Sequence, residues 1–329
     1  MRRWLFVRWL ALIACLPLTG CFNGLLLTPT HVSDPVEETV VTEPKRWLCR
    51  DKIAIIDVSG MILNARSSGI FGDGENMVSL FRERLDAAAK DPRVKAVVLR
   101  INSPGGAVTA SDIMYRDLVN FRARTGKPVV ACMMDLAASG AYYLAMGADY
   151  VYCHPTTVTG SIGVIMSLYN ASGLAEKIGI TSNAIKSGPI KDIGNPLRDM
   201  TDEERAVLQH LVNSFYDQFV QVVSTGRHMA EDEVRKLADG RVYAGTEAKT
   251  LRLVDEVGYL EDAIDCAKSL AQVRDAAVVA YERGGGYCGS VYAGLPHIPS
   301  NINIHLDVPG LSHSRGAAFM YVWEPGVLP

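Results

Sequence analysis

The sequence lacks the features that mark several common classes of protein. Its 33 Lys and Arg residues stand against 36 Asp and Glu residues, with no basic run interleaved with aromatics, so we expect no nucleic-acid partner. Its seven cysteines include no C-x-x-C pair, so we expect no metal site. It has neither a G-x-S-x-G nor an H-E-x-x-H motif, which excludes the hydrolase elbow and the zinc-protease helix.

Signals for a histidine-based triad and for a nucleotide cofactor are also missing. None of the histidines stands in a Ser-His-Asp context, so a nucleophilic serine needs another base, and lysine is the remaining option. Gly284–Gly289 fits the dinucleotide pattern G-x-G-x-x-G, but Pro296 and Pro299 follow where its helix should begin. We interpret it as a loop and expect no cofactor.

The N-terminus resembles an export signal. Residues 1–8 carry three arginines, and the apolar run Trp9–Leu18 that follows is shorter than the roughly 20 residues that span a bilayer. It ends on Leu18-Thr19-Gly20-Cys21, which resembles the lipobox of bacterial lipoproteins and implies lipid attachment at Cys21. The alternative is an uncleaved anchor in which Cys21 has no role. Both interpretations place the body of the protein outside the cytoplasm, anchored to the membrane.

Alternating strands and helices predict an α/β fold with a sheet covered on both faces. We expect an export signal at 1–21, a flexible tether at 22–50, a folded domain at 51–282 and an irregular tail at 283–329. Thr201 and Glu204 have the spacing of a capping box. The expected strands are Ile53–Val58, Val94–Ile101, Pro128–Met134, Tyr150–Cys153 and Ala276–Tyr281, and the expected helices are Met77–Lys90, Ala107–Arg124, Ser139–Met146, 201–226, Ala230–Ala238 and Asp262–Gln272.

Ser139 is the candidate nucleophile. It follows a buried strand and opens a helix among small residues, in Asp135-Leu136-Ala137-Ala138-Ser139-Gly140-Ala141. The free amides at such a helix start favour a developing oxyanion. The alternative is that Ser139 is only a helix N-cap.

A second glycine-containing turn is a candidate source of oxyanion amides. Asn102-Ser103-Pro104-Gly105-Gly106 leaves the strand that ends near Ile101, and glycine amides without side chains can point into a cleft. The alternative is an ordinary strand-to-helix turn. Ser103 is a poor rival nucleophile, because a residue before proline is held in an extended conformation.

Four motifs in order resemble the SppA-type signal peptide peptidases, a family within the ClpP/crotonase superfamily. They are NSPGG at 102–106, DLAASGAYYLA at 135–145, TGSIGVI at 159–165 and KSGPIKDIGNP at 186–196. The resemblance covers roughly residues 50–270. It implies a ClpP/crotonase-like fold with stacked β-sheet layers flanked by helices. One feature departs from it: Thr250-Leu251-Arg252-Leu253-Val254-Asp255 lacks the glycine that relatives usually have before Leu-Val-Asp.

The resemblance also implies the roles of individual residues. Ser139 would be the nucleophile and Lys191 the general base, with Gly106 and Gly140 supplying oxyanion amides and Ser161 orienting the lysine. Short family members form ring-like oligomers in which the serine and lysine of one site come from neighbouring subunits. A lysine base requires burial, which lowers the pKa of an amine. Asp192 should therefore face away from Lys191. Lys186 is the less favoured alternative base.

The expected function is that of an exported, membrane-anchored serine endopeptidase with a Ser-Lys dyad. Its expected substrates are extended apolar peptides with a small residue at the cut, such as released signal peptides, and its expected assembly is a homo-oligomeric ring with shared active sites. Two alternatives remain on the same fold. One is a non-catalytic scaffold at the membrane, and the other is a crotonase-like acyl-CoA enzyme, which export away from coenzyme A disfavours.

Overall fold

A computed structural model describes residues 35–69, 72–283 and 319–323 of the chain. The predicted export signal and Cys21 lie outside these residues. The expected α/β fold is confirmed. In the described ranges, no helix has the length and apolar character needed to cross a bilayer.

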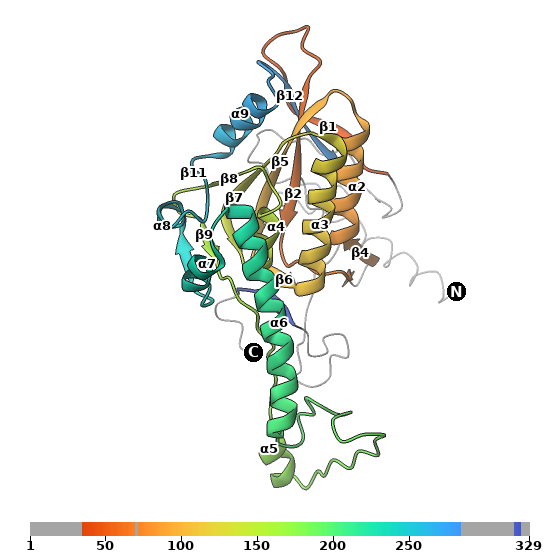
Figure 1. Ribbon diagram of the computed structural model, residues 1–329. Helices are drawn as coiled ribbons and strands as arrows, with labels where there is room; N and C mark the ends of the chain where they lie inside the picture. Colours follow the sequence, from red (N-terminus) through yellow and green to blue (C-terminus); the bar gives the residue numbers. More distant parts are fainter. Residues whose placement is uncertain (1–34, 70–71, 284–318, 324–329) are drawn as a thin grey trace, which may run out of the picture. The chain divides into compact units, whose positions relative to one another are not determined.

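The central feature is a mixed sheet that has nine strands within the described ranges (Figure 1). Six neighbouring strands, β12-β2-β5-β7-β8-β11, are parallel. At one edge β1 pairs antiparallel with β12, and beyond the carboxyl half of β7 lie β9 and then β10. The strands are β1 Glu37–Thr42, β2 Lys52–Ser59, β5 Val94–Ser103, β7 Val129–Ala138, β8 Tyr150–Cys153, β9 Val158–Gly160, β10 Val242–Ala244, β11 Glu256–Val257 and β12 Ala277–Glu282.

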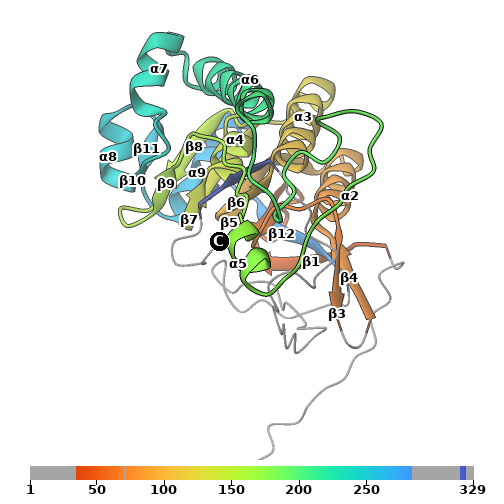
Figure 2. The same cartoon turned by 90° about the horizontal axis from the view of Figure 1, so that it is seen from below.

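Two small ladders accompany this sheet: β3 (Arg66–Gly69) pairs with β4 (Gly72–Asn76), and β6 (Gly105–Ala107) pairs with β13 (Met320–Val322). Helices cover both faces of the sheet. Figure 2 shows α2 beside α3 and α4 beside α6. The helices are α2 Met77–Lys90, α3 Val108–Thr125, α4 Gly140–Ala145, α5 Ser172–Lys177, α6 Asp202–Arg227, α7 Glu231–Leu237, α8 Gly245–Thr250 and α9 Leu260–Leu270.

The alternation of side chains along the strands divides the core in two. On β5, Val97 and Leu99 belong to the larger core together with residues of α2, α3, α4 and α6. Ala96 and Val98 point the other way and pack with residues of α9. Successive strand residues face opposite sides of a sheet, so an unbroken apolar strand is buried on both faces, as the sequence predicted.

The structure departs from the predicted tether and tail in two places. Within the tether, Glu37–Thr42 forms β1 at the edge of the sheet, and the Asp275 carboxylate accepts the backbone N–H of Arg46 at 2.7 Å. Within the tail, Met320–Val322 forms β13. Both are short strands that pair with distant partners, so local periodicity gives no signal for them.

Residues 166–211, which we call the arm, extend beyond the sheet (Figure 1). The arm contains α5, a long connection and the outer part of α6, and most of its residues are exposed. The predicted capping box starts α6: Thr201 Oγ1 accepts the N–H of Glu204, and Glu204 Oε2 accepts the N–H of Thr201. These two bonds satisfy amides that a helix start otherwise leaves free.

Arg252 stands where relatives usually have a glycine before Leu-Val-Asp, and its backbone conformation shows why glycine suits this position. Its φ is +62°, in the left-handed region that costs a non-glycine residue about 1 kcal/mol or more. Its backbone makes bonds that glycine would keep, from its N–H to Lys249 O and from Arg227 Nε to its own carbonyl. Among the described residues, its guanidinium makes one ion pair, an exposed one of 3.9 Å with Glu233, which contributes little to stability.

We therefore expect Arg252→Gly to raise the free energy of unfolding by about 0.5–1 kcal/mol, measured by denaturant titration. Lys236→Gly is the matched control. Lys236 is exposed inside α7, where glycine lowers stability by about 1 kcal/mol. A loss of stability in Arg252→Gly comparable to that of Lys236→Gly would contradict the strain at this position.

Candidate active site

Ser139 stands at the junction of β7 and α4 in a strained backbone conformation. Its φ and ψ are 53° and −115°, a combination that costs a non-glycine residue about 1–3 kcal/mol and is concentrated at functional sites. Its side chain makes no capping hydrogen bond with α4. Ser139 does stand at the N-cap position of α4, but its hydroxyl makes no capping bond there. The N-cap alternative therefore does not explain why this residue is a serine. Its own N–H is already bonded to Gly160 O at 2.8 Å.

The glycine turn lies directly against the start of α4. A Cβ on Gly105 would stand 2.6 Å from Gly140 N, and a Cβ on Gly140 would stand 3.2 Å from Gly106 N. The two predicted oxyanion amides are therefore neighbours, one on β6 and one on α4. Side chains are excluded on both sides, because a Cβ on Gly106 would lie 2.0 Å from Ile62 O and one on Gly140 would lie 2.3 Å from Ser111 Oγ.

The remaining polar residues of this turn have structural bonds. Asn102 Oδ1 accepts the N–H of Leu136 at 3.1 Å, which ties the end of β5 to β7. The buried Ser103 hydroxyl accepts the N–H of Gly105 at 3.1 Å. Ser103 is therefore part of the turn that presents the glycines.

Ser161 lies beside Ser139 because β9 pairs with β7. Ala138 stands opposite Gly160 in the register, so the residues that follow them are adjacent. Ser161 is buried and, like Ser139, has a positive φ, of 50°. It borders an open cavity of about 530 Å³, whose other walls include Val164, Ile165, Tyr216, Val322 and Trp323.

Lys191 is not brought to this site. It lies in the connection between α5 and α6, which Figure 1 places at the end of α6 distant from α4. Its side chain is exposed, and within the described ranges no residue bonds to its ammonium group. The structure thus assembles Ser139, Gly106, Gly140 and Ser161 in the body and leaves Lys191 on the arm.

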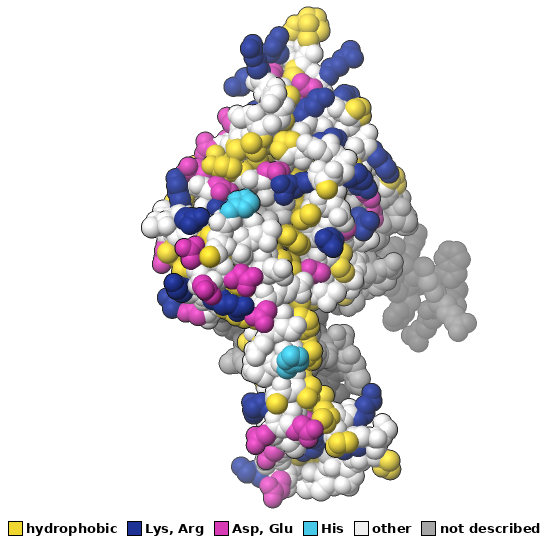
Figure 3. Space-filling view, viewed as in Figure 1, with side chains coloured by type: hydrophobic (Ala, Val, Ile, Leu, Met, Phe, Trp, Pro, Cys, Tyr) yellow, Lys and Arg dark blue, Asp and Glu magenta, His cyan; other side chains and the backbone are white. Residues whose placement is uncertain are grey.

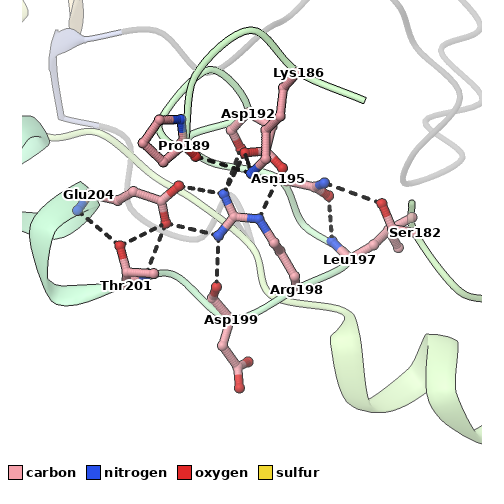
Figure 4. Close-up of polar contacts among 10 residues, drawn as sticks. All are labelled: Ser182, Lys186, Pro189, Asp192, Asn195, Leu197, Arg198, Asp199, Thr201 and Glu204. Atoms are coloured by element: carbon pink, nitrogen blue, oxygen red, sulfur yellow. Dashed lines mark hydrogen bonds and ion pairs between the residues drawn. The ribbon is translucent and has the colours of Figure 1, made fainter. Parts of the chain in front are cut away.

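Arg198 organises the region around Lys191 (Figure 4). Its guanidinium bonds to the carboxylates of Asp192 and Glu204. Lys186 donates to the same Asp192 carboxylate and to Pro189 O. Asp192 therefore faces Lys186 and Arg198. Among the described residues, Lys186 has a carboxylate partner and Lys191 has none. Hydrogen bonds from Arg198 and Lys186 hold the pKa of Asp192 well below its usual range.

Two contributors to the site gave no signal in the sequence. β13 lies against β6, so Tyr321 stands opposite Gly106, although it comes from the predicted irregular tail. Ser111 on α3 packs against Gly140 and donates to Ala107 O at 3.1 Å. Neither residue belongs to a motif. Within the described ranges, no cluster of His, Cys, Asp and Glu side chains is arranged to bind a metal.

Comparisons with known proteins indicate a peptidase. A model of peptidase family S49 matches residues 122–274, a range that holds Ser139, Ser161 and Lys191. A proposed signal peptide peptidase SppA from Enterococcus faecium is 39% identical over 70% of this chain and 67% of its own length. A proposed protease from Methanocaldococcus jannaschii is 41% identical over 69% and 73%. The chloroplastic serine protease SPPA of Arabidopsis thaliana is 35% identical over 70% of this chain and 34% of its own length.

The ion pairs of the arm predict a dependence of stability on pH. Its bonds to Arg198 lower the pKa of Glu204 from 4.5 to about 2. A lowered carboxyl pKa contributes stability above the unfolded value, and this contribution is lost as the pH falls through the folded value. We expect Glu204→Gln to be less stable than the unsubstituted protein at pH 7, with the difference shrinking as the pH falls from about 4.5 towards 2.

Denaturant titration across this pH range, with hydrogen exchange at the first turn of α6, measures the difference. The control is Glu203→Gln, because Glu203 is the exposed neighbour of Glu204. A Glu204→Gln deficit that stayed constant down to pH 2 would contradict an electrostatic origin.

Proposed function

Because the chain belongs to peptidase family S49, we propose that Ser139 and Lys191 form its catalytic dyad. It is a serine peptidase of the SppA type, and its α/β body has the ClpP/crotonase-like fold. The observation that carries the proposal is the strained Ser139, whose hydroxyl caps no helix and which adjoins two glycine amides.

The geometry assigns separate tasks to the residues of the body. Ser139 Oγ attacks the carbonyl carbon of a peptide bond, and the amides of Gly106 and Gly140 stabilise the oxyanion. The Ser139 amide takes no part, since it is bonded to Gly160 O. Ser161, adjacent to Ser139 across the β7–β9 pairing, orients the base.

The base comes from a neighbouring subunit in this proposal. Burial is what lowers the pKa of an amine towards neutrality, yet Lys191 is exposed on its own chain while Ser139 is buried. The cavity of about 530 Å³ that borders Ser161 has room for a lysine side chain from outside. A partner that inserts Lys191 there supplies both the burial and the contact with Ser139.

The arm has the surface that such an assembly needs. Of the fourteen large hydrophobic side chains exposed in the described ranges, eight lie on the arm, and Figure 3 shows hydrophobic side chains along it. Apolar surface of this extent favours docking with another protein. We assign it to a homo-oligomeric ring. The residues are Tyr169, Leu174, Ile178, Ile180, Ile185, Leu197, Val207 and Leu211.

Export and lipid attachment at Cys21 would place this assembly at a membrane, on its extracytoplasmic side. Apolar peptides, such as released signal peptides, are the substrates that suit this place. The name of the Enterococcus faecium relative and the apolar side chains around β13 support this substrate class.

Subunit mixing tests the shared dyad. We expect Ser139→Ala and Lys191→Ala each to lose peptide cleavage by a factor of about 10³ or more, while their co-assembly recovers part of it. Activity appears in the mixture because some interfaces join an intact serine to an intact lysine. The measurement is hydrolysis of an apolar fluorogenic peptide, with labelling by a serine-directed probe.

Lys177→Ala is the control for this experiment. Lys177 is an exposed lysine of α5 on the same arm, and its removal should leave cleavage unchanged. A mixture as inactive as its two components, although mixed oligomers form, would refute the shared site. Full activity of Lys191→Ala would refute the dyad itself.

The membrane anchor has its own test. We expect Cys21→Ser to abolish incorporation of a labelled fatty acid and to shift the protein from the membrane fraction, because the thiol is the site of lipid attachment. Cys49→Ser, on a cysteine of the folded body, should change neither property. Lipid labelling that persisted in Cys21→Ser would show that the lipobox interpretation is wrong.

A further inference from the structure

The connection between β1 and β2 carries two large hydrophobic side chains into solvent. We call residues 43–51 the β1–β2 turn. Trp47 is 89% exposed and Leu48 is 70% exposed, whereas a tryptophan in a folded protein normally covers most of its large ring. Figure 1 shows this turn beyond the end of the sheet that is opposite the arm. The exposed pair is therefore separate from both the arm and the candidate active site.

Hydrogen bonds hold the β1–β2 turn in one shape. The Cys49 N–H donates to Arg46 O at 2.9 Å, a bond that closes a β-turn with Trp47 and Leu48 at its two central positions. The Arg46 N–H donates to the Asp275 carboxylate at 2.7 Å, and the Cys49 thiol donates to the Asp275 carbonyl at 3.0 Å. An ordered backbone, tied to the residue just before β12, thus presents the two apolar side chains to solvent.

Basic side chains surround this exposed pair. Figure 3 shows Lys and Arg side chains gathered below a hydrophobic tip. Cations outnumber anions here, although the whole chain has a net charge of −3. One of the anions, Asp275, accepts the amides of the turn, and another, Asp51, lies 3.6 Å from Lys95. The cations are Lys45, Arg46, Arg50, Lys95 and Arg274, and the anions are Glu43, Asp51 and Asp275.

An exposed tryptophan and leucine within a ring of cations match the chemistry of an anionic lipid surface. Tryptophan favours the boundary between lipid head groups and acyl chains. Lys and Arg side chains next to that boundary are attracted to lipid phosphates. A protein partner fits less well, because two side chains provide only a fraction of the roughly 800 Å² that each partner buries in a stable protein interface.

The length of chain before β1 allows the turn to reach a membrane. Pro35, the first described residue, comes fourteen residues after Cys21, and a chain of that length spans at most about 50 Å. Trp47 comes twelve residues after Pro35, which by the same limit is at most about 43 Å. A protein held by lipid at Cys21 can therefore place Trp47 on the surface of the same bilayer.

We propose that the β1–β2 turn is a second membrane contact, in which Trp47 and Leu48 enter the interface of an anionic bilayer and the flanking arginines bind lipid phosphates. This proposal rests on the membrane location in the proposed function and adds an orientation to it. Strands β2, β5 and β7 run in parallel away from the turn, and Ser139 follows the end of β7. The active site then opens at the far end of the sheet, so a peptide reaches it only after leaving the bilayer.

Tryptophan fluorescence of the full-length protein tests this contact. The protein is reconstituted in vesicles of phosphatidylethanolamine and phosphatidylglycerol whose acyl chains carry bromine, which quenches tryptophans that enter the interface. Trp323→Phe leaves Trp47 as the reporter, and Trp47→Phe leaves Trp323, which bonds to Pro104 at the opposite end of the sheet. We expect brominated lipid to lower the Trp47 emission by about twofold or more and the Trp323 emission hardly at all.

The double variant Trp47→Phe, Trp323→Phe records any emission from Trp4 and Trp9, and co-flotation with the vesicles reports the anchor separately. Protein that co-floats while Trp47 stays unquenched would overturn the second contact and leave the anchor standing. Since the vesicles contain no other protein, that result would assign the exposed pair to a protein partner. Protein that does not co-float would refute the membrane location and this proposal with it.

Removal of charge tests the role of the arginines. Arg46→Gln with Arg50→Gln, made in the Trp323→Phe protein, should lower the salt concentration that halves the quenching of Trp47 by about twofold or more. The matched control removes two exposed lysines of α5 and α7, Lys177→Gln with Lys236→Gln, and should leave that concentration unchanged. An equal decrease in both proteins would show that net charge, and not the turn, attracts the lipid, and would overturn the proposal.

Discussion

The close approach of the Gly105–Gly106 strand to the start of α4 is the constraint on which the site depends. A Cβ on Gly105 would stand 2.6 Å from Gly140 N, so the two backbones pack together only because Gly105 has no side chain. Ser139 accepts a strained conformation at the same junction. This junction is anchored to the central sheet. Asn102, at the end of β5, accepts the backbone N–H of Leu136 on β7.

The arm solves a different physical problem. A lysine that acts as a base must be shielded from solvent. A serine that attacks a peptide must be accessible to that peptide. Within one chain, the structure separates the two groups and fixes the arm by the Arg198 pairs with Asp192 and Glu204. Those pairs keep the neighbouring carboxylate away from Lys191. Assembly, in the proposed function, then brings together what the single chain keeps apart.

Sequence patterns predicted the parts of the structure in which local chemistry repeats. Met77–Lys90 and Tyr150–Cys153 match the observed elements residue for residue, because their apolar spacing reports the face that they bury. Strands β1 and β13 were not predicted, because each is short and is defined by its pairing with a distant strand, β12 and β6 respectively. The structure places the glycines of two motifs, Gly106 and Gly140, close together beside Ser139. The aromatic surroundings of Tyr321 could not be predicted in this way, because Tyr143 lies on α4, Phe219 lies on α6 and Tyr321 itself comes from the tail.

Helix α6 connects the arm to the body of the protein (Figure 1). Its 26 residues span about 39 Å. Its outer turns belong to the arm, and its inner turns carry Phe215 and Phe219, which contact Tyr321. In the proposed ring, a neighbour docked against the outer turns would therefore contact the same helix that packs against Tyr321.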